Sequence, residues 1–325
     1  VLPPDARPEV APQVASYLSA AAAFLHAGMV DIDNLHRRLG EVRDDRDLVR
    51  DNGPGEMFFR AYGGNFRYAT NLPFQQYGYN ATGDYAAIQL GGNLFKQESE
   101  NGIWRFGVAG SVGWLKFSPI AIDGASRTRA TIYRINGYGT YQSNNGWYVD
   151  GIVSGGWFDG DVSTDSRGRT SSMNGSVFAA SIEGGYPFAM PYGMNLEPQL
   201  QLIGQHVGFS NTIDADNLEV NIGSQNQVVG RAGVRLTRPL IVSAGRLTPY
   251  FGFDLLHAFT GGANVQVGDM RFESGKLGDA YQLSLGVNGM PTAKMSLYGR
   301  VSYQHALGAA GVQGWLFNAG LRYLF

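Results

Sequence analysis

The sequence has no cysteine and few charged residues. Because none of its 325 residues is cysteine, a disulfide framework, thiol catalysis and cysteine-based metal sites are excluded. Asp, Glu, Lys and Arg together make up 16% of the chain, against about 25% in an average protein. The net charge is only -2, so the composition indicates neither a nucleic-acid partner nor a polybasic contact with a membrane.

Long apolar runs are missing as well. No uninterrupted apolar run approaches the roughly 18 residues that a membrane-spanning helix needs. If the chain lies in a membrane, it therefore has to cross as strands. No signal peptide is recognisable at Val1, and we expect the chain to be the C-terminal piece of a longer precursor.

Glycine and alternating apolar residues are abundant. The chain has 46 glycines, about double the usual share of roughly 7%. It ends on residues 315–325, in which every odd position except Ala319 is large and apolar. In an outer-membrane barrel, one face of such a strand meets lipid and the other meets the lumen. This pattern favours a transmembrane barrel over a glycine-rich soluble β-sandwich.

The first 55 residues differ from the rest of the chain. Residues 1–12 contain four prolines and read as an extended linker. Over residues 13–43, apolar side chains recur at spacings of three and four, which predicts an amphipathic helix. Gly28 interrupts this stripe, and Gly40 is placed to cap it. The C-terminal half of the helix is crowded with polar residues, namely Asp31, Asp33, Asn34, His36, Arg37, Arg38 and Glu41.

From Glu56 onward the helical spacing of apolar residues ends, and apolar residues recur at every second position. Thirteen runs alternate clearly enough to be strands, but single-chain bacterial barrels need an even number. Short turns alternate with longer loops if residues 258–278 form a single extracellular loop with a small hairpin at 264–272. We therefore predict a 12-stranded antiparallel barrel over residues 56–325, closed by pairing of the last strand with residues 57–68.

Several short motifs follow one another along the chain, at residues 7–10, 33–41, 58–64, 77–79, 87–91 and 321–325. Each motif alone is weakly specific. Their order and spacing resemble those of the translocator domain of a conventional monomeric autotransporter, the type Va secretion system. The resemblance covers nearly the whole chain and implies an all-β fold, a transmembrane barrel with the N-terminal helix threaded through its lumen.

The resemblance also implies a function. An N-terminal passenger would be secreted to the cell surface, residues 1–12 would be its remnant, and residues 13–43 would stay in the pore as a linker helix. We expect a monomer in the outer membrane of a Gram-negative bacterium, in contact with lipid and lipopolysaccharide, with no cofactor and no nucleic acid. The other partners would be the barrel-assembly machinery and periplasmic chaperones, with Tyr323 and Phe325 as the assembly signal.

The dimensions of the helix fit this arrangement. A helix about 10 Å wide roughly fills a lumen of intermediate size, and residues 13–41 would be about 43 Å long. Successive side chains of a strand face opposite ways, and we call this rule strand parity. It turns a set of charged side chains inward: Arg60, Arg105, Arg134, Asp150, Glu183, Glu197, Arg231, Arg235, Asp254, Arg300 and Arg322. We predict ion pairs between this set and Asp31, Asp33, Arg37, Arg38 and Glu41 of the helix. The alternative is that these charges line a hydrated pore.

Catalysis has little support in the sequence. Some family members cut their own linker helix with an Asn side chain, and two consecutive Asn then occupy the positions of Asp33 and Asn34 here. Because Asp33 lacks the nucleophilic amide, we do not expect self-cleavage by this route. The passenger would then be cut elsewhere or stay attached.

Two other outer-membrane functions remain as alternatives, a hydrolase or esterase barrel and a diffusion porin. A hydrolase needs convergent groups, whereas parity turns His206, His257 and His305 to the lipid, beside aromatic residues such as Phe209, Phe259 and Tyr303. A porin would not need the Pro-rich leader and the helix.

The Asp-rich residues 159–165 lack the full ligand pattern of a calcium loop, so we expect an exposed polar loop and no metal site. We predict a translocator without enzymatic activity.

Overall fold

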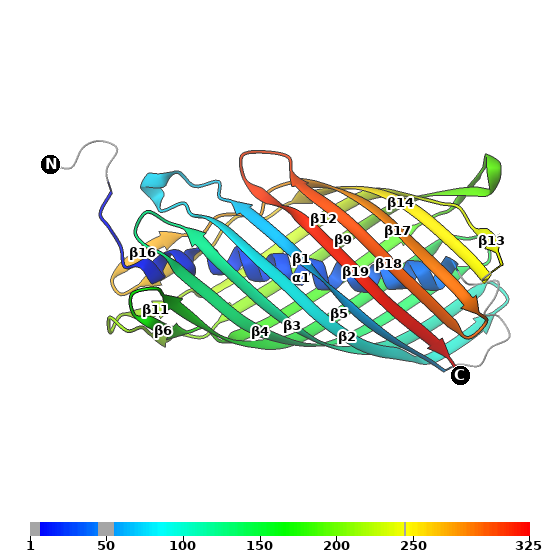
Figure 1. Cartoon of the computed structure of the whole chain (residues 1–325), viewed down its shortest axis with the longest axis horizontal. Helices are drawn as coiled ribbons and strands as arrows, with labels where there is room; N and C mark the ends of the chain where they lie inside the picture. Colours follow the sequence, from blue (N-terminus) through cyan, green and yellow to red (C-terminus); the bar gives the residue numbers. More distant parts are fainter. Residues whose placement is uncertain (1–6, 45–54, 244) are drawn as a thin grey trace.

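The computed structural model describes residues 7–44, 55–243 and 245–325, with helix side chains described up to Gly40. Helix α1 (Pro12–Asp44) runs lengthwise inside a closed barrel of antiparallel strands (Figure 1). The 12 barrel strands are β1 (Glu56–Ala69), β2 (Asn80–Ser99), β3 (Gly102–Ile120), β4 (Ser126–Ser143), β5 (Tyr148–Thr164), β7 (Gly175–Gly185), β9 (Met194–Phe209), β12 (Ser224–Thr237), β14 (Gly245–Ala258), β17 (Ala280–Thr292), β18 (Met295–Ala306) and β19 (Gly311–Leu324). The prediction of a 12-stranded barrel with a threaded helix is confirmed.

The barrel closes where its first and last strands meet. Strand β19 pairs antiparallel with β1, and Arg322 lies opposite Phe58. Every other barrel strand pairs with its neighbours in chain order. Closure leaves no free sheet edge, which a membrane-embedded sheet requires because lipid offers no hydrogen-bond partners.

Smaller elements extend the two ends of the barrel. At one end, a separate four-stranded sheet is formed by β10 (Thr212–Ile213), β11 (Glu219–Asn221), β15 (Asn264–Val267) and β16 (Met270–Glu273). At the same end, β6 (Gly168–Ser172) pairs antiparallel with the last residues of β5. The 310 turn η1 (Phe74–Gln76) follows β1 in the chain. At the end that carries the C-terminus lie β8 (Phe188–Met190), the 310 turn η2 (Pro191–Gly193) and β13 (Leu240–Val242). Long loops mark the extracellular side of such barrels and short turns the periplasmic side, so the four-stranded sheet is extracellular.

The hairpin expected inside the loop of residues 258–278 is present as β15 and β16. The expectation of a loop at residues 159–165 was wrong, because β5 continues to Thr164 and then turns back into β6. Cross-strand pairing, including the exposed ion pair Asp161–Arg169 at 2.5 Å, holds this segment as a hairpin extension of the barrel wall.

Side chains alternate between the lumen and the outer surface along each strand. In β3, for example, Trp104 and Trp114 are exposed, whereas Arg105 is buried. The outer face presents many large apolar residues, which is stable only when lipid covers them. The placement of Phe209 on the lipid side was wrong, since its odd number puts it on the face opposite His206. Its ring lies in the lumen, 5.4 Å from the ring of Phe24.

The lumen is filled by α1, whose two halves meet different surroundings. The N-terminal half is apolar, and Phe24 and Leu25 are fully buried among barrel side chains such as Phe158. A stretch of α1, Pro12–Gly40, is long and apolar enough to cross a membrane as a helix, but it lies inside the barrel rather than against lipid. The expectation of a cap at Gly40 was wrong, because the helix continues to Asp44.

Candidate functional site

The polar half of α1 faces a lumen wall lined with charge. All of the barrel residues predicted to turn inward are buried: Arg60, Arg105, Arg134, Asp150, Glu183, Glu197, Arg231, Arg235, Asp254, Arg300 and Arg322. Buried charges are costly unless they are paired and hydrogen-bonded. The contacts between helix and wall therefore decide whether the helix is held in the pore.

Asp31 is bound from three barrel strands. Its Oδ2 lies 2.6 Å from Nε of Arg134 on β4. Its Oδ1 accepts hydrogen bonds of 2.8 Å from the hydroxyls of Tyr62 on β1 and Tyr85 on β2. The carboxylate thus has a cation and two hydroxyl donors around it, which is the coordination that a buried charge needs.

Two residues further along the helix, at Asp33, a chain of alternating charges crosses the lumen. Asp33 accepts from Arg300 of β18 and from Arg37 of the same helix, the latter at 3.0 Å. Arg37 reaches Asp254 of β14 at 2.6 Å. Asp254 is also bound by Arg231, at 3.0 Å, which in turn reaches Glu183 of β7 at 2.5 Å. Helix and wall therefore share a single network of alternating charges.

Asn34 lies at the seam where the barrel closes. Its Nδ2 donates to Oε1 of Gln89 at 3.2 Å, and its Oδ1 accepts from the amide of Asn318 on β19. Arg60 of β1 donates to the backbone carbonyl of Asn34 and to Oδ1 of Asn318, both at 2.9 Å. The helix is thus hydrogen-bonded to both strands that form the seam.

Arg38 anchors the helix nearest the periplasmic end. Its guanidinium contacts the carboxylate of Glu56, the first residue of β1. It also lies over the rings of Phe58 and Tyr138, 4.0 and 4.8 Å from their centroids. Cation–π contacts add to an ion pair when the group is desolvated, as here.

The other predicted lumen residues have partners on the wall. Asp150 accepts from Thr140 at 2.5 Å, Glu197 from Tyr148 at 3.1 Å, and Arg322 donates to Ser296 at 2.8 Å. The guanidinium of Arg235 lies 4.5 Å from the ring centroid of Tyr250, and Arg105 is buried. The side chain of Glu41 lies outside the described residues.

At the extracellular end, Arg7 binds the segment before α1 to two loops of the barrel. Its guanidinium pairs with Asp123 at 2.5 Å, donates to the hydroxyl of Tyr79 at 3.1 Å, and lies 4.1 Å from the ring centroid of Tyr77. We call this set the Arg7 clamp. Burial alone would raise the pKa of Asp123, but hydrogen bonds from Tyr79 and Arg7 outweigh it and hold that pKa below its usual range.

Sequence reasoning missed several of these partners. The parity rule that placed the charges also turns Tyr62, Tyr85 and Gln89 inward, so a search for neutral polar residues would have found them. Glu56 was seen only as the start of the strand pattern. Arg7 was noted only as part of a motif, because its partners come from two loops whose folding the sequence pattern does not reveal.

His36, Asp150 and Glu183 offer ligand atoms that lie within 4.8 Å of one another. Each group is already engaged, since His36 bonds Ser181 at 2.9 Å and Glu183 binds Arg231. A cation at this point would also face the guanidinium of Arg231. The cluster is therefore better described as part of the ion-pair network than as a metal site.

The histidines considered for catalysis lie apart from one another. His206 bonds Asn226 at 2.7 Å, His257 pairs with Asp279 at 3.0 Å, and His305 stacks beside Tyr303. Each lies on the outer face of a different strand, so they do not converge on one substrate.

Comparison with known proteins agrees with this geometry. A family model described as the autotransporter beta-domain matches residues 57–308. Over an alignment of 331 positions, the chain is 27% identical to the pertactin autotransporter of Bordetella bronchiseptica, covering 97% of this chain and 34% of that protein. The chain thus spans about a third of the length of the pertactin relatives that it matches.

Two solved structures show the same fold. The beta domain of the Bordetella autotransporter BrkA has a TM-score of 0.64 at 21% identity, covering 84% of this chain and 100% of that one. The translocator domain of NalP from Neisseria meningitidis has a TM-score of 0.66 at 15% identity, covering 91% and 98%. The family match and the lipid-facing outer surface place the barrel in the outer membrane of a Gram-negative bacterium. The chain belongs to the autotransporter beta-domain family.

Proposed function

We propose that this chain carries an N-terminal passenger across the outer membrane and then anchors it at the cell surface. One observation supports this most directly. Arg7 lies at the extracellular mouth with Tyr77 and Asp123, whereas both ends of the barrel meet at the opposite end, where the Phe325 N–H bonds Gly55 O. A passenger joined before Arg7 would therefore have crossed through the lumen, because α1 spans the pore between these two points (Figure 1).

The packing of the lumen limits the form in which a passenger travels. Side chains around the whole circumference of α1 are buried, including Ala15, Ala20 and Phe24 at 0% exposure. A barrel that closes around one helix about 10 Å wide has no room for a folded domain. The passenger would therefore cross unfolded and fold outside, and residues 1–12 would be the linker that joins it to the pore helix.

We further propose that the helix plugs the pore once export ends and that the chain performs no catalysis. The Asp33 carboxylate is bound by Arg37 and Arg300, and the Asn34 amide is bound by Gln89 and Asn318. Neither group is available to attack the backbone. Mass spectrometry of the outer-membrane fragment should therefore find no new terminus at Asp33 or Asn34.

The expected partners beyond the passenger are the barrel-assembly machinery, periplasmic chaperones and outer-membrane lipid, with the chain acting as a monomer. Tyr323 and Phe325 support a role in assembly because both are exposed at the end of the closing strand, 48% and 64% respectively. The assembly machinery could therefore contact these two side chains, although the backbone of the strand is already paired.

The export proposal is tested by an epitope placed before Val1, behind a signal peptide, in the full chain. Antibody should bind the epitope on intact cells. A matched control carries the same epitope in the periplasmic turn between β2 and β3, at Glu100, and should bind antibody only after permeabilisation. An N-terminal epitope that is likewise hidden on intact cells would refute the proposal.

A further inference from the structure

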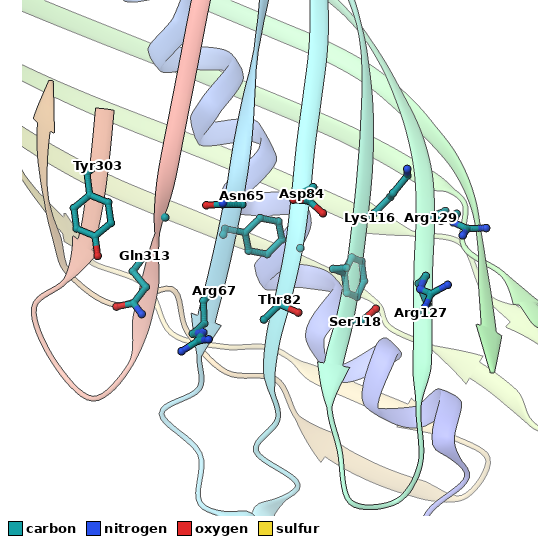
Figure 2. Close-up of a pocket in the computed structure, with 14 residues that line it drawn as sticks. Asn65, Arg67, Thr82, Asp84, Lys116, Ser118, Arg127, Arg129, Tyr303 and Gln313 are labelled. Atoms are coloured by element: carbon teal, nitrogen blue, oxygen red, sulfur yellow. The ribbon is translucent and has the colours of Figure 1, made fainter. Parts of the chain in front are cut away.

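The outer surface of the barrel carries a basic hollow near its extracellular end. It has a volume of about 550 Å³ and lies across β1, β2, β3 and β4, with β18 and β19 at its edge (Figure 2). Four cationic side chains line it, and we call them the basic patch: Arg67, Lys116, Arg127 and Arg129. All four point outward and are exposed, so they do not belong to the lumen network.

The strand register brings like charges together in the basic patch. Lys116 of β3 lies directly opposite Arg129 of β4, and Asp84 of β2 lies opposite Lys116 on the other side. Like charges directly opposite each other on neighbouring strands are destabilising. Within the described residues, none of the four cations has a carboxylate at ion-pairing distance, and nearby Asp161 is paired with Arg169. The hollow sets four cations against one carboxylate, Asp84, and Asp161 lies opposite Arg129 on the next strand. The patch therefore keeps an excess of positive charge, although carboxylates flank it.

The position of the patch indicates which surroundings it meets. Trp114 precedes Lys116 by two residues on the same outer face, and Trp315, Tyr133 and Trp157 are also exposed aromatic residues on neighbouring strands of the barrel wall. Aromatic belts of this kind mark the boundary between hydrocarbon and headgroups. Two residues along a strand correspond to about 7 Å. The basic patch thus lies at headgroup level on the extracellular side, just beyond the lipid core.

We propose that the basic patch binds the phosphate groups of an outer-leaflet glycolipid, the phosphorylated headgroup of lipopolysaccharide. Phosphate oxygens accept charge-assisted hydrogen bonds from Arg and Lys, and a phosphate between Lys116 and Arg129 would remove their repulsion. Hydroxyl and amide groups in the same hollow, such as Thr82, Ser118 and Gln313, suit sugar hydroxyls. The apolar belt below the hollow suits the acyl chains. The inference deepens the proposed membrane anchoring and rests on the outer-membrane location.

The test measures lipid binding by the purified full chain in nanodiscs of phosphatidylcholine. The probe is bisphosphorylated lipid A, with dephosphorylated lipid A and inorganic phosphate as separate arms. The double variant Lys116→Gln and Arg129→Gln should weaken lipid A binding by about 2- to 30-fold, the range that two exposed charge contacts give. The matched control, Arg271→Gln with Lys276→Gln, removes two exposed extracellular cations outside the hollow and should bind lipid A as the native chain does.

The three probes distinguish binding of the phosphorylated lipid from binding of the lipid alone or of free phosphate. Dephosphorylated lipid A should bind native chain and double variant equally, and millimolar inorganic phosphate should not displace lipid A. Equal lipid A binding by the double variant, an equal loss in the control variant, or displacement by inorganic phosphate would each overturn the proposal. Because lipid binding is measured on the isolated chain without a passenger, failure here leaves the export proposal untouched, and the epitope experiment tests that separately.

Discussion

Replacing Arg134 with Gln should make α1 leave the lumen, and so open the pore, more often than a substitution on the outer face does. Arg134 supplies the cation for Asp31, and both side chains are almost fully buried, at 2% and 3% exposure. After the change, the hydroxyls of Tyr62 and Tyr85 are the only donors left to the Asp31 carboxylate among the described residues. Breaking a buried pair by removing one partner costs about 3–5 kcal/mol. Since about 1.4 kcal/mol changes an equilibrium constant tenfold, the ratio of open to plugged pores should rise about 100-fold or more.

Conductance of the full chain in planar bilayers measures this ratio directly. Arg127→Gln is the matched control, because it makes the same change on the same strand but on the outer face. The double variant Asp31→Asn with Arg134→Gln removes both charges and should plug much more tightly than the single variant. The reasoning would be refuted if Arg134→Gln opened no more often than Arg127→Gln, or if the double variant opened as often as Arg134→Gln.

Three further predictions concern other parts of the chain. The lowered pKa of Asp123 means that the Arg7 clamp is fully stabilising above the ordinary carboxyl value of 3.8 and weakens as pH falls through the lowered pKa. A spin label can be attached at Glu9→Cys alone, because the chain has no other cysteine. The label should be immobile at pH 7 and more mobile below about pH 4. Asp123→Asn should make it mobile at pH 7, and unchanged mobility in that variant would contradict the clamp. Gly28→Val should raise pore opening, because a Cβ there would overlap with Oε1 of Gln205. Conductance like that of the native chain would show that the wall adapts. Phe325→Ala should lower the yield of folded barrel in the outer membrane, measured by heat-modifiable mobility in gels, while an unchanged yield would remove Phe325 from the assembly signal.

Strand alternation made most of the fold predictable. Because successive side chains of a strand face opposite ways, each arginine or carboxylate on the polar face could be assigned to the lumen from its number alone. The same rule, applied correctly, would place Phe209 in the lumen. The prediction put it on the lipid side because it was grouped with His206, although the positions of the two differ by an odd number. The 12-strand count followed from the alternation of short turns with long loops.

The specific pairings were beyond this reasoning. Parity states which face a residue occupies but not its height or rotation relative to a separate helix. Arg300 could therefore be assigned to the lumen, but not to Asp33. The Arg7 clamp depends on a loop in which Tyr77 adopts a left-handed backbone conformation, with φ of 57°, a local geometry that no alternation encodes. Contacts that depend on loop shape needed the structure.

The central claim is that α1 occupies and closes the pore. The most direct measurement compares the conductance of the full chain with that of a chain lacking residues 1–50, both reconstituted in planar bilayers. The account predicts a small, intermittent conductance for the full chain and a large, steady conductance once the helix is removed. Equal conductance of the two proteins would contradict it.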